Sequence, residues 1–117
     1  MSYPKVARLI LLLIEQTNDG RLSWEPTDRK DVFQANFPRY SVRILTVPAE
    51  FESDVMLQII NDEGFIVESI SDPQVNSHLE GAYTKMLALH ESARRSAMGV
   101  EQALDDIIGW LEPDIPF

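Results

Sequence analysis

The chain has 117 residues, a formal net charge of −9 and no cysteine. The lack of cysteine excludes a disulfide scaffold, a thiol nucleophile and a cysteine zinc site, and the acidic excess argues against nucleic acid or an anionic membrane surface as a partner. Hydrophobic residues make up 44% of the chain, which is enough for one folded core. We therefore predict a single acidic domain over residues 1–117, located in the cytoplasm.

A helix is predicted from about residue 3 to residue 17. Ser2 and Pro4 suit a helix N-terminus, and Gly20 suits the left-handed residue that follows a helix end. The apolar residues of this segment cover most of its circumference, so the helix needs cover on more than one side. Its longest apolar run, Leu9–Ile14, is far shorter than the roughly 20 residues of a membrane span.

Alternating apolar and polar residues predict three to five antiparallel strands after this helix. The candidate strands are residues 21–24, 32–37, 40–46, 55–60 and 65–70. The clearest connection is the loop from Asn61 to Gly64, where the glycine supplies the positive φ of a hairpin turn.

An apolar seam, spaced alternately by four and three residues, runs through the C-terminal third of the chain. Its ten positions hold Leu79, Tyr83, Met86, His90, Ala93, Ala97, Val100, Leu104, Ile107 and Leu111. The seam predicts a long C-terminal helix, with Ser77 as its N-cap and Glu80 at capping-box spacing. The unbroken register favours continuity across Gly99 over a break there. The order of N-terminal helix, antiparallel meander and long C-terminal helix packed on the sheet predicts an α+β fold.

Residues 112–117 are predicted to form an extended apolar tail, because Pro113 stops the helix. Trp110 lies off the seam, and Ile115 and Phe117 add apolar groups beyond the helix. Such groups either fold back onto the domain or dock on a second protomer or another partner.

Charge is distributed unevenly along the chain. Residues 44–84 carry eight acidic and no basic groups, and residues 96–117 carry five acidic and no basic groups. These tracts are either a solvated surface that keeps the protein soluble or an acidic face that meets a basic protein partner. Composition alone does not separate the two interpretations.

The sequence contains no phosphate loop, nucleophile elbow or zinc-protease motif, so we expect no enzyme activity, no cofactor and no bound metal. His78 and His90 are twelve residues apart, which is too far along one helix for them to share a metal. His90 lies in the middle of the seam. The alternatives there are a core or interface histidine bonded to a carbonyl or to its symmetry mate, a pH switch and a general base.

The leading hypothesis is a non-catalytic interaction or regulatory module that self-associates as a homodimer through the long helix. The candidate interface comprises Leu79, Tyr83, Met86, His90, Ala93, Ala97, Val100, Leu104, Trp110, Ile115 and Phe117. One alternative is a small-molecule-binding domain. Its pocket, between sheet and helix, would be lined by Trp24, Phe33, Tyr40, Tyr83 and His90. The other alternative is an acidic inhibitor or immunity-type protein that covers a basic partner surface.

Three features are spread along most of the chain. They are Trp24, the hairpin at Gly64, and the spacing Leu79-x-x-x-Tyr83 that leads to Ala93-Arg94-Arg95. This arrangement resembles that of small bacterial α+β proteins of unknown function. The resemblance implies neither an activity nor any functional residue.

Overall fold

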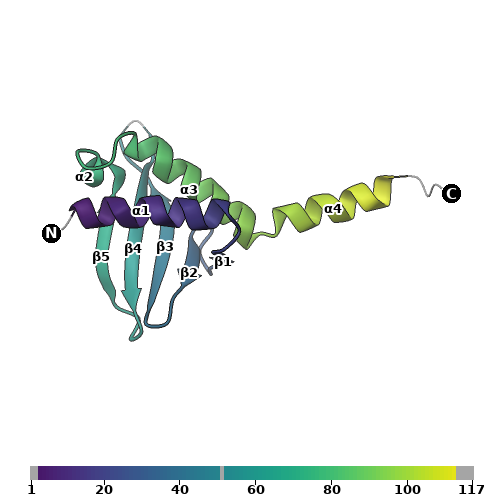
Figure 1. Cartoon of the computed structure of the whole chain (residues 1–117), viewed down its shortest axis with the longest axis horizontal. Coiled ribbons are helices and arrows are strands. Elements are labelled where there is room, and N and C mark those ends of the chain that lie inside the picture. Colours follow the sequence, from purple (N-terminus) through teal and green to yellow (C-terminus); the bar gives the residue numbers. More distant parts are fainter. Residues whose placement is uncertain (1–2, 51, 113–117) are drawn as a thin grey trace.

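The computed structural model describes residues 3–50 and 52–112 (Figure 1). The elements in chain order are α1 (Tyr3–Asn18), β1 (Glu25–Pro26), β2 (Phe33–Asn36), β3 (Tyr40–Val47), β4 (Asp54–Asn61), β5 (Ile66–Ser71), α2 (Asp72–Val75), α3 (Ala82–Ala97) and α4 (Val100–Leu111). A helix, an antiparallel meander and C-terminal helices follow one another, so the predicted α+β fold is confirmed.

The strands form one sheet in the order β1-β2-β3-β4-β5, in which each strand pairs antiparallel with its sequence neighbour. The central pair, β3 and β4, runs in register from Tyr40 opposite Asn61 to Val47 opposite Asp54. At the predicted hairpin, Gly64 has a φ of 89°, and the Asn61 side chain accepts hydrogen bonds from the Glu63 and Phe65 N–H groups. These bonds confirm the turn.

The predicted strand at residues 21–24 is wrong, because β1 begins at Glu25. The reason is that both N–H groups of Trp24, in the backbone and in the indole ring, donate hydrogen bonds to side chains of helices. Its backbone N–H donates to Ser96 Oγ at 3.0 Å, and its indole N–H donates to Thr17 Oγ1 at 2.9 Å. Trp24 is therefore held by two helices and is unable to join the sheet ladder at this point.

The core lies between one face of the sheet and the helices α1 and α3, which cross that face together (Figure 1). Its central side chains are Ala7, Ile10 and Leu13 of α1, Met86, Leu89 and Ala93 of α3, and Val42, Ile44, Leu57 and Ile70 of the sheet. The other face carries hydrogen-bonded polar side chains. Arg43 Nε donates to Gln34 Oε1 at 2.7 Å, and Ser41 Oγ donates to Asn36 Oδ1 at 2.9 Å. This face is mixed, because Leu45 and Ile60 are also on it and are buried outside the core cluster. The helices α1 and α3 lie against the opposite face.

The start of the long helix also differs from the prediction, because α3 begins at Ala82 and not near Ser77. Capping-box geometry occurs earlier, where the Ser71 N–H donates to Gln74 Oε1 at 2.9 Å. Next to it, the buried Asp72 carboxylate accepts a hydrogen bond from the Val55 N–H at 2.9 Å. These bonds hold residues 72–75 in the short helix α2, so the chain must turn again before α3 starts.

The predicted continuity across Gly99 is wrong. Gly99 has a φ of 64°, in the left-handed region, and the Met98 N–H donates to the Arg94 carbonyl at 2.9 Å, which closes the end of α3. Among the described elements, the backbone of α4 comes close to that of α3 alone. It therefore projects from the body (Figure 1) and contributes to the 62 Å length of the molecule.

Gly99→Ala is expected to favour one continuous helix through α3 and α4. An alanine in the left-handed conformation is less stable by about 1–2 kcal/mol, and alanine in a helix is better than glycine by about 1 kcal/mol. The measurement is the distance between spin labels at the exposed positions Glu91 and Asp105, which should change. Gly109→Ala removes a glycine inside α4 and should leave this distance unaltered. An unchanged distance in Gly99→Ala contradicts the prediction.

Candidate interaction surface

The apolar side of α4 has no cover in the described part of the chain. The exposed apolar side chains are Leu104, Ile107, Ile108, Trp110 and Leu111, with exposed fractions of 45–90%. Because successive helix residues are about 100° apart, these side chains fall within an arc of about 160° together with Val100 and Ala103. The opposite side carries Glu101, Gln102, Asp105, Asp106 and Glu112. Contiguous exposed apolar side chains with a polar rim are typical of a protein-binding surface.

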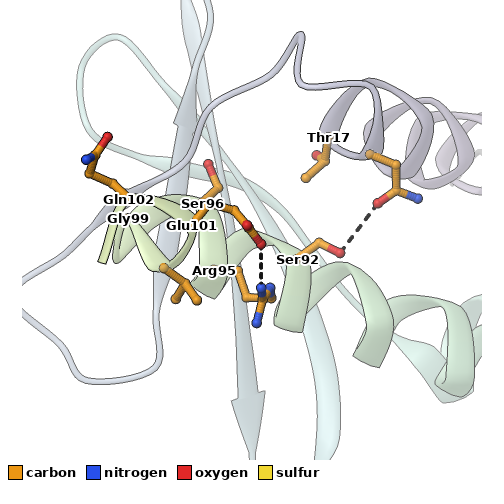
Figure 2. A pocket seen from close by; sticks show the side chains of 9 residues that line it. Thr17, Ser92, Arg95, Ser96, Gly99, Glu101 and Gln102 are labelled. Carbon is orange, nitrogen blue, oxygen red and sulfur yellow. Dashed lines mark hydrogen bonds and ion pairs between the residues drawn. The ribbon is translucent and has the colours of Figure 1, made fainter. Parts of the chain in front are cut away.

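A polar pocket of about 380 Å³ lies at the joint between α3 and α4 (Figure 2). It is lined by Thr17, Asn18, Ser92, Arg95, Ser96, Gly99, Val100, Glu101 and Gln102. Arg95 donates to Glu101 Oε1 at 2.7 Å across the joint. Exposed ion pairs of this kind are weak, so the pair orients α4 without locking it. The two charged side chains of this pocket, Arg95 and Glu101, thus pair with each other.

A second groove, of about 390 Å³, lies between α1 and the turn from β2 to β3. We call it the leucine groove, and it is lined by Leu9, Leu12, Leu13, Leu22 and Phe37 with Gln16 and Arg21. Leu12 and Phe37 are 44% and 40% exposed. The groove is therefore an open apolar surface with one cation in its lining.

A third recess, of about 380 Å³, is lined by Pro26, Thr27, Arg29, Lys30, Asp31, Phe33, Arg94 and Met98. One of its cations is already paired, because Arg94 Nε donates to Glu91 Oε2 at 3.0 Å. This hydrogen bond lowers the pKa of the Glu91 carboxyl and raises the pKa of Arg94. The lining of the recess thus combines three cations, Arg29, Lys30 and Arg94, with the carboxylate of Asp31.

The structure does not place the five predicted pocket residues around one cavity. Trp24 and Phe33 are buried in the core, whereas Tyr40 is 48% exposed at the start of β3 and Tyr83 is half-buried on α3. Of the five, Phe33 alone lines one of the three pockets described above.

His90 is a core residue bonded to a carbonyl. Its Nε2 lies 2.8 Å from the Asp31 carbonyl oxygen, and its ring centroid lies 5.4 Å from that of Phe33. Asp31 has a φ of 63°, a conformation that only a few residue types tolerate. The His90 contact therefore anchors the turn before β2 onto α3.

The predicted interface divides at Gly99 into a buried half and an exposed half. Leu79, Met86, His90 and Ala93 are buried, and Tyr83 and Ala97 pack partly against the same core. These residues serve the chain's own core. Leu104 and Trp110 are exposed on α4, and Val100 is half-buried at its start. Ile115 and Phe117 lie outside the described residues.

Sequence reasoning missed the leucine groove. The available signal was the N-terminal helix that is apolar on most sides, which required more than one covering surface. The structure buries one side of α1 and leaves Leu11 and Leu12 more than 40% exposed. The position of Phe37 beside α1 depends on how the meander packs, which periodicity does not reveal.

Within residues 3–50 and 52–112, no group of three or more histidine, aspartate or glutamate side chains is arranged to hold a metal ion. No helix in that part of the chain is both long and apolar enough to cross a bilayer. No protein-family model, curated protein or solved structure matches the chain, which leaves the surfaces described above as the observations that bear on its function.

Proposed function

We propose that this protein is a non-catalytic interaction module of the cytoplasm that forms a homodimer through α4. The observation that carries the proposal is the uncovered apolar side of α4. A helix of twelve residues is marginal in water by itself, and most helical stability in proteins comes from packing an amphipathic face. The helix therefore needs a partner surface that the described residues of its own chain do not supply.

The charge of α4 narrows the class of partner. Residues 100–112 carry four carboxylates and no cation. Helices that lie on membranes depend on basic polar faces that attract anionic lipids, and nucleic acid requires cations that neutralise phosphates. The polar side of α4 has the opposite sign, which favours a protein surface that is apolar with a basic rim.

Ile107→Asp is expected to weaken self-association about thirtyfold or more, the effect of removing a well-buried hot-spot side chain. Sedimentation velocity over a concentration series should show a dimer for the native chain at tens of micromolar and a monomer for this variant. None of the α4 side chains is buried, so circular dichroism of the body should stay native.

Gly109→Asp is the matched control for this experiment. It adds the same charge to the same helix, but at about 160° from Ile107, and should leave the dimer intact. A native chain that remains monomeric at tens of micromolar contradicts the proposal. Equal weakening by both variants also contradicts it, because the effect would then come from charge alone.

A further inference from the structure

We infer that α4 of one copy docks in the leucine groove of a second copy, and that the exchange is reciprocal. This inference rests on the proposed self-association and specifies the surface that receives α4. It follows from the apolar match, the charges and the geometry of the two surfaces.

The apolar side chains of α4 match those of the leucine groove. The large side chains of α4 at positions 104, 107, 108 and 111 follow the spacing by which amphipathic helices lie in apolar grooves. The leucine groove offers five apolar side chains, of which Leu12 and Phe37 are the most exposed. Each surface has what the other lacks, namely a ridge on α4 and an open groove beside α1.

The charges around the groove complement those of α4. Lys5, Leu9, Leu12 and Gln16 have the spacing of one helix face, and the Arg21 N–H donates to the Gln16 carbonyl at 2.9 Å. Arg21 lines the groove, and Lys5 lies one helical turn before Leu9 on the same face of α1. Among the described residues that line the groove, none is a carboxylate. The acidic rim of α4 thus meets a groove whose described lining carries one cation and no carboxylate.

The same charges disfavour the simplest alternative, in which two α4 helices pair with each other. That pairing would bring together the eight carboxylates of two 100–112 segments with no cation in either. Like charges across an interface are unfavourable. The third recess is a weaker apolar match than the groove, since its lining has three apolar side chains against five.

The geometry makes the contact intermolecular. The joint at Gly99 directs α4 away from the sheet (Figure 1), and among the described elements its backbone comes close to that of α3 alone. The α4 helix therefore does not occupy the leucine groove of its own chain (Figure 1). A second copy that donates its α4 and accepts the first one in return forms a closed two-fold dimer with two identical contacts.

The first test compares two adjacent leucines of α1. Leu12→Asp, in the groove, should weaken the dimer about thirtyfold or more, as Ile107→Asp does. Leu11→Asp is the control, because Leu11 is 47% exposed and Leu12 is 44% exposed, yet Leu11 does not line the groove. The control should remain dimeric by sedimentation velocity.

The second test mixes two monomeric variants. The Ile107→Asp chain keeps an intact groove, and the Leu12→Asp chain keeps an intact α4. Mixing them should form a heterodimer through one remaining contact, detected by fluorescence anisotropy of one labelled chain. Neither variant should bind a labelled copy of itself at the same concentration.

The outcomes separate this inference from the proposed function. A dimer that Ile107→Asp disrupts and Leu12→Asp does not, or a mixture that forms no heterodimer, overturns docking in the groove and leaves self-association through α4 standing. Assemblies that keep growing with concentration overturn the closed reciprocal exchange. A monomeric native chain overturns both, and would assign α4 to a different protein.

Discussion

Trp24→Ala is expected to lower the free energy of unfolding by about 3–5 kcal/mol, the usual cost of truncating a buried tryptophan. The Trp24 side chain is 3% exposed. Its two N–H groups donate to Thr17 at the end of α1 and to Ser96 near the end of α3. The substitution thus leaves a cavity where the two helices and the loop before β1 meet, and it leaves Thr17 without its donor.

The measurement is urea unfolding followed by circular dichroism. All variants should carry Ile107→Asp, so that dissociation of a dimer does not contribute to the free energy. Trp24→Phe keeps an aromatic ring and loses the indole N–H donor, so it should lower the free energy of unfolding by less than Trp24→Ala does. Thr17→Val leaves the indole N–H unpaired and should cost about 1–3 kcal/mol. A Trp24→Ala loss no larger than that of Thr17→Val would show that ring packing contributes nothing.

Met86→Ala is expected to lower the free energy of unfolding by about 2–5 kcal/mol. Met86 is fully buried between α3 and the sheet, whereas its neighbour Leu87 is 39% exposed. Leu87→Ala is therefore the control and should cost less than about 1 kcal/mol. Both residues are good helix formers, so a difference in helix propensity does not explain the contrast.

The same pair of variants tests how α3 is oriented. If Met86→Ala and Leu87→Ala destabilise equally, the first half of the seam does not face the core as described. If Met86→Ala weakens the dimer beyond its effect on folding, the buried half of the seam takes part in the interface. The expected result is a loss of stability with dimer affinity unchanged, measured under conditions where the variant is fully folded.

Several elements followed from the sequence because local physical rules dictate them. Alternation at residues 32–37 and 40–46 predicted β2 and β3, since one face of each strand must be apolar to lie on a core. Gly64 predicted the hairpin, because a positive φ there needs a residue without a side chain. The apolar N-terminal segment predicted α1 within one residue of its observed end at Asn18.

Other features escaped local rules because they depend on competing hydrogen bonds. Trp24 lies in an alternating segment, yet its N–H groups are captured by α1 and α3. Ser77 and Glu80 have capping-box spacing, yet Ser71 and Gln74 form the observed box. Spacing shows which bonds are available, and the packing of the whole chain selects among them.

The sequence by itself determined the α+β order of elements, the meander and the apolar spacing that runs from residue 79 to residue 111. Only the tertiary structure decided whether these apolar side chains lie in the core or on the surface, because the same spacing suits either a core or an interface. The left-handed backbone at Gly99 makes the division. It leaves Met86 and Ala93 in the core and turns Leu104 and Ile107 outward. The leucine groove also depends on tertiary packing, because its lining comes from α1, from the residues that follow it and from the turn after β2. No periodicity in the sequence connects these segments.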